Sequence, residues 1–445
     1  MAVPEELHES EPEALDEAES APEALDAAWC EHRFDYLAPD LARNLPDTLA
    51  YMQANHPVAH SEEHGGYWIV TRYEDVLRVA QDWETFSSAH GVSVPGGSMT
   101  VTAIPEHIDP PLQRVYKRLI NAYFTPAVVH RYEEPTRQLF TGLVDEVIES
   151  GSCEFMADIA RPFPGLAFFD LVLHAPADEV RAINEMATSA SIPGNPNRQE
   201  SWAGMFAWIT EFIERRRGEP PKGDVVDAVL AAEIEGRPIT DDEIIGILQL
   251  LILGGLETTA GALGQFMIRF AREPEIPALL RDDPSLIPDA VEELLRLEPP
   301  FISIARTAMC DTEIGGQAIR AGEKVLIYWA AANRDGDEFT CPAAFDLDRP
   351  SNRHLSFGAG PHRCAGSTLA RMNLRVAVEQ LTRRFRDIRL RDDAEQIEFH
   401  SALNRAPVEV PITFSPGARE GGTAGPRLGA GNNDECLNDE CLNDE

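Results

Sequence analysis

Apolar residues recur with helical periodicity through much of this chain, above all between residues 111 and 272, where proline and glycine separate successive helical stretches. A further helix is predicted at 74–81. Short runs of β-branched and aromatic residues predict strands at 58–60, 67–71, 308–314, 317–319, 324–328 and 408–413. Many helices, few strands and no regular alternation of the two predict a mainly α fold with a small β subdomain.

The longest helical stretch runs from Asp241 to Arg272. It opens on a capping box, in which Thr240 precedes Glu243 by three residues. At about 1.5 Å per residue, such a helix is roughly 48 Å long and crosses a whole domain. Its most apolar part, residues 244–256, is short for a membrane span and includes a glutamine. We therefore expect a core helix.

The two ends of the chain differ from its middle. No Lys or Arg precedes Arg33, whereas acidic residues recur, so residues 1–27 are predicted to be an acidic disordered tail. Residues 416–445 are Gly-rich and end in repeats of Asn-Asp-Glu-Cys-Leu. The cysteines of these repeats could bind a metal, but low complexity favours a second tail. The catalytic domain is expected to span residues 28–415.

Charge and cysteine content narrow the possible partners. The formal net charge is −37 and the pI about 4.6, which argues against nucleic acid and anionic membranes as partners. The seven cysteines show no CxxC pair, which is typical of a reduced, intracellular protein. The sequence shows no signal peptide. We therefore expect a cytoplasmic protein.

One cysteine lies in an unusual setting. Cys364 follows a Gly-rich loop that begins near His354, and it directly precedes an apolar-periodic stretch at 367–385. A helix N-terminus favours a thiolate over a thiol. Two chemistries use such a thiolate: nucleophilic catalysis and axial ligation of haem iron. A buried structural cysteine is a third interpretation.

The motif Phe-Gly-x-Gly-x-His-x-Cys-x-Gly, from Phe357 to Gly366, resembles the haem-binding loop of the cytochrome P-450 monooxygenases. Two further motifs extend the resemblance over about residues 30–415. The glycines, acid and hydroxyl at 254–258 resemble the family's oxygen-activating helix, although helix packing with a threonine bonded back to its own helix is an alternative. Glu293 and Arg296 resemble the family's ExxR pair, with Arg349 as its third member.

The resemblance implies the cytochrome P-450 fold, a triangular helical prism with haem b between the long helix and the helix after the Cys loop. Cys364 would be the axial iron ligand. Other residues implied to contact the haem are Phe357, Gly358, Gly366, Gly254, His354, Arg306, Lys117 and Gln113. Many members have His where this chain has Gln113 and Arg where it has Lys117. His107 is out of register to replace that His.

The resemblance also implies the reaction. One atom of O2 would enter a C–H bond of a small apolar, terpenoid-like or fatty substrate, with a macrolide, steroid or aromatic as alternatives. Glu257 and Thr258 would deliver protons. The expected substrate pocket comprises Ile104, Leu250, Leu253, Ile302 and Ile304.

Electrons would come from NAD(P)H through a separate reductase and a ferredoxin. The donor would dock on a positive patch on the Cys364 side, formed by Arg114, Lys117, Arg118 and Arg363. A monomer is expected. A peroxide-driven haem enzyme, a haem-binding sensor and a cysteine-nucleophile hydrolase remain as alternatives.

Overall fold

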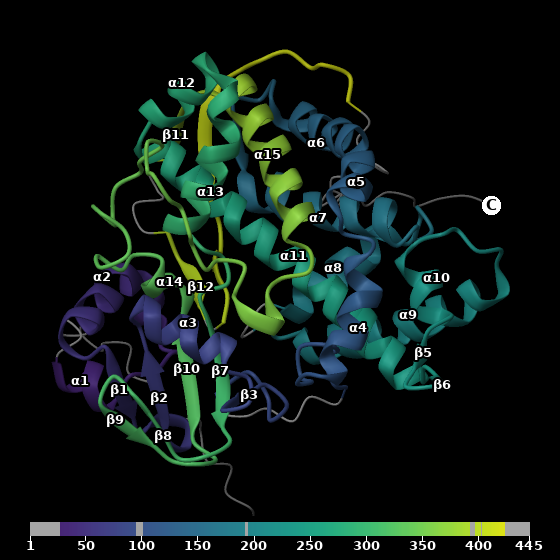
Figure 1. The fold of residues 1–445 in the computed structure, drawn as a ribbon. Coiled ribbons are helices and arrows are strands. Elements are labelled where there is room, and N and C mark those ends of the chain that lie inside the picture. The colour runs from purple at the N-terminus through teal and green to yellow at the C-terminus, as the bar shows by residue number, and fades with distance from the viewer. Residues whose placement is uncertain (1–26, 95–100, 192–194, 392–396, 402, 423–445) are drawn as a thin grey trace, which may run out of the picture.

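The computed structural model describes residues 27–94, 101–191, 195–391, 397–401 and 403–422. Most of the two predicted tails therefore lies outside the described residues. Figure 1 shows a small sheet-containing part, which combines N-terminal elements (purple) with strands from residues 303–328 (green), and a larger helical part around one long central helix.

The helical part confirms the prediction of a mainly α fold. The helices are α1 (Ala27–His32), α2 (Pro39–Asn55), α3 (Tyr73–Gln81), α4 (Leu112–Asn121), α5 (Pro126–Val129), α6 (Glu133–Val147), α7 (Pro162–Ala167), α8 (Val180–Ser191), α9 (Arg198–Gly218), α10 (Val225–Leu230), α11 (Asp241–Arg272), α12 (Glu275–Asp282), α13 (Ile287–Leu297), α14 (Trp329–Ala332) and α15 (Ser367–Arg384). The capping box predicted for α11 is present, with the Thr240 side chain and Glu243 capping each other's backbone N–H groups.

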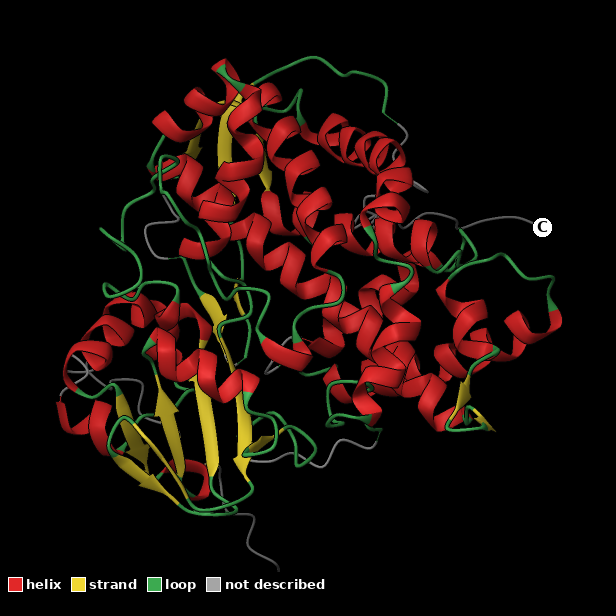
Figure 2. Ribbon diagram, viewed as in Figure 1, coloured by secondary structure: helices red, strands yellow, loops and turns green. Residues whose placement is uncertain are grey.

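The strands form several small sheets (Figure 2). They are β1 (Val58–Ser61), β2 (Tyr67–Val70), β3 (Phe86–Ser87), β4 (Ser152–Glu154), β5 (Glu233–Ile234), β6 (Arg237–Pro238), β7 (Ser303–Ala308), β8 (Thr312–Ile314), β9 (Gln317–Ile319), β10 (Lys324–Tyr328), β11 (Arg386–Leu390), β12 (Phe399–Ser401), β13 (Arg405–Pro407) and β14 (Pro411–Ser415). The main sheet has the order β1-β2-β10-β7-β3, and only its β2–β10 pair is parallel.

Both faces of this sheet are buried, each by its own apolar cluster. Along β10, Val325 and Ile327 face one cluster, whereas Leu326 and Tyr328 face the other. A strand that is covered on both sides has a nearly continuous apolar sequence. The apolar run at 325–328, which predicts this strand, is the result of its burial on both faces.

The single strand predicted at 308–314 is wrong. β7 ends at Ala308 and β8 begins at Thr312, and exposed residues separate them. β7 pairs with β10, whereas β8 forms a hairpin with β9. The two strands belong to different sheets, so the chain must turn between them.

The largest apolar cluster surrounds α11 and includes residues of α6, α13 and α15. Although α11 is long and apolar enough by composition to cross a membrane, 61% of its most apolar 18-residue window is buried inside the protein. It is the core helix that the sequence predicts.

The segment after β14 remains packed against the helical part. The Asp145 carboxylate on α6 accepts hydrogen bonds from the backbone N–H groups of Glu420, Gly421 and Gly422, at 3.0, 2.8 and 3.1 Å. The Arg384 guanidinium at the end of α15 also donates to this carboxylate. The boundary predicted at residue 415 thus precedes a segment that joins α6 to α15.

Candidate active site

Backbone contacts fix the loop that carries Cys364. The Cys364 N–H donates to the Phe357 carbonyl at 2.8 Å, and Gly358 and Gly360 adopt φ values of +66° and +67°. A Cβ atom on Gly360 would lie 2.4 Å from the Ala80 carbonyl oxygen at the end of α3. Glycine is therefore required there for two reasons, its positive φ and the close approach of α3.

The Cys364 thiol lies deep in the protein, although the residue has accessible surface. This combination indicates that the sulfur faces an internal space rather than bulk solvent. Burial raises the pKa of the thiol, while the Gly366 N–H and the charges of Lys117, Arg363 and Arg371 oppose that rise. A bound metal cation would lower this pKa further and favour the thiolate.

The middle of α11 opens onto free space. Gly254 is exposed within a helix that crosses the core, and a Cβ atom there would meet nothing within 4 Å. By contrast, Gly261 and Gly264 pack against β13, where a Cβ atom would lie 3.1 Å from Ala406 Cβ and 2.6 Å from Pro407 Cγ. Gly254 therefore borders open space, whereas Gly261 and Gly264 allow β13 to pack closely against α11.

The predicted proton-delivery residues lie next to this opening. Thr258 is half-buried, and its Oγ1 donates to the Gly254 carbonyl at 2.7 Å, which is the back-bonded arrangement considered from the sequence. Glu257 is buried, with 6% of its surface exposed. The hydroxyl oxygen of Thr258 keeps its acceptor lone pairs while it donates to the helix carbonyl.

The side chains predicted to contact haem carboxylates lie in two kinds of environment. Gln113 Nε2 donates to the Pro361 carbonyl at 2.7 Å, and Lys117 Nζ donates to the carbonyls of Pro361 and of Arg363, the latter at 2.6 Å. Both side chains therefore brace the Cys loop. Arg306 on β7 is instead buried, and within the described part of the chain its guanidinium donates only to the carbonyl of its own neighbour, Ala305.

His354 belongs to a charged network behind the Cys loop. Its Nε2 contacts Glu292 at 3.1 Å, and Glu292 forms a two-point ion pair with Arg371 of α15, at 2.7 Å for each contact. The Arg371 guanidinium in turn lies over the Phe357 ring, 4.3 Å from its centroid. This network connects α13, the loop and α15.

Glu293, Arg296 and Arg349 form a second, fully enclosed network. Arg296 donates twice to Glu293, at 2.8 Å each, and Arg349 Nη2 donates to Glu293 at 3.2 Å. Arg296 also donates to the carbonyls of Asn333, Pro342 and Ala344. A two-residue motif on α13 thus anchors the irregular segment between α14 and the Cys loop.

The five expected pocket residues do not gather in one apolar cluster. Ile302 and Ile304 are buried in the two clusters on opposite faces of the main sheet, and Ile104 packs in the helical cluster beside Gly246. Leu250 and Leu253 of α11 are half-buried, and Leu253 borders the helical cluster, as Phe357 and Ala365 of the Cys loop do.

The sequence did not reveal a cluster formed by the segment between β3 and α4. Asp109 accepts hydrogen bonds from the hydroxyls of Ser87 and Ser88, and Ser88 Oγ contacts His362 Nε2 at 3.0 Å. His107 lies in the same segment, and its buried Nε2 has no hydrogen-bond partner among the residues that the structure describes. Short polar residues in a loop give no periodic signal, so only the folded backbone brings them together.

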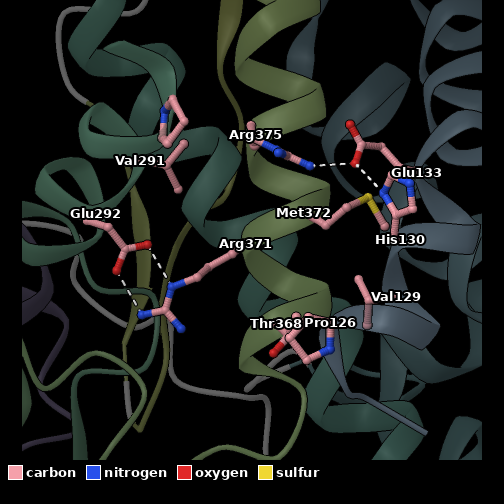
Figure 3. Close-up of a pocket in the computed structure, with 11 residues that line it drawn as sticks. Pro126, Val129, His130, Glu133, Val291, Glu292, Thr368, Arg371, Met372 and Arg375 are labelled. Atoms are coloured by element: carbon pink, nitrogen blue, oxygen red, sulfur yellow. Dashed lines mark hydrogen bonds and ion pairs between the residues drawn. The ribbon is translucent and has the colours of Figure 1, made fainter. Parts of the chain in front are cut away.

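A surface groove of about 320 Å³ lies along α15, between α5 and α13 (Figure 3). Arg371, Arg375 and Met372 of α15 line one wall, and Glu133 and Glu292 neutralise the two guanidinium groups. This groove does not contain the Cys364 sulfur or the residues of α11. We therefore distinguish it from the internal space that Cys364 and Gly254 face.

These residues suit a haem. A thiol that faces an internal space can supply an axial ligand, the open side of α11 at Gly254 admits a flat group, and the buried Arg306 suits its carboxylates. Within the described ranges, no group of three or more His, Cys, Asp or Glu side chains is placed to hold a bare metal ion.

Comparison with known proteins agrees with this geometry. The sequence model of the cytochrome P450 family matches residues 193–410, a range that contains Thr258, Glu293 and Cys364. A steroid C26-monooxygenase from Mycolicibacterium smegmatis is 32% identical over 381 residues, which cover 84% of this chain and 93% of that protein. A nocardicin C N-oxygenase from Nocardia uniformis subsp. tsuyamanensis is 35% identical over 365 residues, covering 78% and 89%.

Solved structures extend the similarity to the fold. A cytochrome P450 from Chondromyces apiculatus is 29% identical, covers 87% of this chain and 100% of its own, and superposes with a TM-score of 0.78.

Proposed function

This chain belongs to the cytochrome P450 family and is a monooxygenase, and from that premise we propose that it hydroxylates a small apolar molecule, terpenoid-like or fatty, in the bacterial cytoplasm. The observation that carries the proposal is Cys364, which combines an enclosed thiol with a backbone-fixed loop at the start of α15. The five described cysteines form no disulfide, which supports a reducing compartment.

We assign haem b as the cofactor and a monomer as the working form. The haem supplies oxygen activation and attack on the C–H bond. Cys364 provides the iron ligand, and Phe357, Gly358 and Gly366 shape the loop around the sulfur. Lys117 and Gln113 hold the loop through its carbonyls.

The Thr258 hydroxyl and the Glu257 carboxyl carry protons to the α11 side of the site. The Thr258 hydroxyl donates to the Gly254 carbonyl, and this bond fixes the orientation of the hydroxyl group. The lone pairs of Oγ1 can then accept a hydrogen bond from water. Glu257, one residue earlier on the same helix, is the proton donor from the protein side.

The Thr258→Ala variant tests this path. NAD(P)H consumption is expected to continue, while the product formed per NAD(P)H falls by about tenfold or more, because positioned proton transfer contributes at least that much. Product and hydrogen peroxide are measured together. Thr258→Ser is expected to restore coupling, and Thr259→Ala, one residue on, is the control. Full coupling in Thr258→Ala would remove Thr258 from the path.

The substrate class rests on the apolar residues of α11, Leu250 and Leu253, and on similarity to an enzyme named for a steroid. A steroid, macrolide or aromatic substrate is the alternative. Screening terpenes, fatty acids, steroids and macrolides for a shift of the haem spin state separates these classes. The class that gives the strongest shift and a hydroxylated product identifies the substrate.

A cysteine-nucleophile hydrolase is disfavoured by one contact. Such an enzyme needs a histidine directed at the sulfur, but the Nε2 of His362, two residues before Cys364, contacts Ser88 Oγ.

Electrons reach the haem from NAD(P)H through a reductase and a ferredoxin. Arg114, Arg118 and Arg363 are exposed on the Cys loop and the adjacent α4, and they pair with no carboxylate within the described part of the chain. On a protein with a net charge of −37, such free cations are an attractive docking point for an acidic donor.

Replacing Arg114 and Arg118 together by Gln is expected to slow reduction by an acidic ferredoxin about three- to tenfold at low salt and to flatten its salt dependence. Stopped-flow reduction at several ionic strengths measures both effects. Arg320→Gln, a loss of positive charge just beyond β9, should leave the rate unchanged. An unchanged rate in the double variant would place the donor elsewhere.

A further inference from the structure

His107 has a buried hydrogen-bonding atom, Nε2, that no other described residue satisfies. Its backbone N–H donates to the Ala103 carbonyl at 2.8 Å, which fixes the turn that carries the side chain. Burial lowers the pKa of the imidazole, and the nearby charges of Arg306 and Lys324 lower it further. A neutral imidazole that carries its proton on Nε2 is a free donor.

Arg306 is a buried cation whose charge acts on His107. Only 2% of its surface is exposed, and its guanidinium forms no ion pair with any described residue. Burial lowers its pKa to about 10, while Glu106 and Asp109 oppose that shift. A buried guanidinium without a counter-charge is strongly unfavourable, so an anion is expected to pair with it.

The nearby carboxylates do not supply that anion. Asp109 is occupied by the Ser87 and Ser88 hydroxyls and by the Ser88 N–H. Burial raises the pKa of Glu106, which favours its neutral form. The other charged group that acts on His107 is Lys324, whose Nζ donates to the carbonyls of His90 and Gly91. Since no carboxylate of the described residues supplies this anion, a bound group is expected to provide it.

We infer that His107 donates from Nε2 to a haem carboxylate that Arg306 also pairs with. This inference rests on the proposed haem enzyme. The α4 side chains Gln113 and Lys117 donate to carbonyls of the Cys loop. The donor to the haem carboxylate is therefore His107, which lies in the loop between β3 and α4. The fold thus brings a histidine that is out of register in the sequence to the side of the buried Arg306.

The test measures how tightly the haem is held, with the purified holoenzyme. Haem release to excess apomyoglobin is expected to be about 10- to 100-fold faster for His107→Phe than for the wild type, since a hydrogen bond to a charged group contributes on that scale. His107→Gln keeps an N–H donor and should recover much of the loss. His90→Phe, an exposed histidine of the neighbouring loop, should release haem at the wild-type rate.

Haem dimethyl ester sharpens the test, because its carboxylates are blocked. The difference between wild type and His107→Phe is expected to disappear with the ester if the imidazole acts through a carboxylate. The same difference with haem and ester would mean that His107 acts only by packing, and equal release from wild type and His107→Phe would overturn the assignment. A wild-type protein that takes up no haem would instead refute the proposed function itself.

Discussion

Cys364→Ala is expected to lose both the red-shifted carbon monoxide band of the reduced protein and all monooxygenase activity. The shifted band reports a thiolate opposite the carbon monoxide, and electron donation from that thiolate favours O–O cleavage. No other described cysteine can substitute, because the backbone of the loop places this sulfur specifically, through the Cys364 N–H bond to Phe357 and the Gly360 contact with α3.

A difference spectrum of the carbon monoxide complex measures the first effect, and product formation measures the second. Cys310→Ser is the matched control, because Cys310 is exposed in the turn between β7 and β8. It should retain the band and the activity. If Cys364→Ala kept the shifted band, the axial ligand would have to be another residue.

Glu293→Leu is expected to give the largest loss of stability, roughly 3–5 kcal/mol of the free energy of unfolding. Only 0% and 1% of the Arg296 and Glu293 side chains are exposed, so the variant leaves a buried guanidinium without its carboxylate. Arg349 loses the same partner. The segment that this network holds leads directly to the Cys loop, so haem retention should fall together with stability.

Urea unfolding midpoints measure this loss. Asp40→Leu is the control, because Asp40 and Arg43 have the same i,i+3 spacing on α2 but keep 34% and 49% of their side chains exposed, and exposed pairs contribute about 1 kcal/mol or less. Adding Arg296→Met to Glu293→Leu should cost less than the sum of the single losses, since the two act as a unit. Strict additivity would mean that the contact contributes nothing.

The same network predicts a pH effect. Burial alone would raise the pKa of Glu293, but hydrogen bonds from Arg296 and Arg349 hold it below its usual value. A carboxyl group with a lowered pKa stabilises the fold above its unfolded pKa, and that contribution is lost as the pH falls through the folded value. Stability of the wild type should thus fall more steeply in acid than that of Glu293→Gln, as measured by unfolding at several pH values.

Local patterns predicted the parts of the fold that depend on neighbours in sequence. The bounds of α11 follow from Thr240 and Glu243 at its start and from its apolar periodicity. The β1–β2 pair follows from two short apolar runs around a polar turn. In both cases the residues that determine the element lie within it or next to it.

Long-range pairing was not predictable in the same way. β2 and β10 are parallel neighbours, although more than 200 residues separate them in the sequence. β4 forms a sheet with β11 and β14, which follow it in the chain by more than 200 residues, and β4 has only three residues, too few for an alternating pattern. Such strands form because the rest of the fold brings them together.

The site shows the same limit. A cluster of glycines in α11 signals close approach, but the sequence does not reveal what approaches. In the structure Gly264 makes room for Met156 and Pro407, and Gly254 faces free space. His107 was set aside by its register, yet the loop's fold places it in the electrostatic reach of Arg306.

The contact between Gly360 and α3 determines where laboratory evolution of this enzyme can succeed. Main-chain atoms on both sides make that contact, with a Cβ atom on Gly360 falling 2.9 Å from Gln81 Cα, so no exchange of side chains on α3 could relieve the crowding. On α11, by contrast, Leu250 and Leu253 are half-buried, and they are side chains that we propose face the substrate. Libraries that vary these two leucines are expected to diversify the accepted molecules while the loop of Cys364 keeps its backbone contacts.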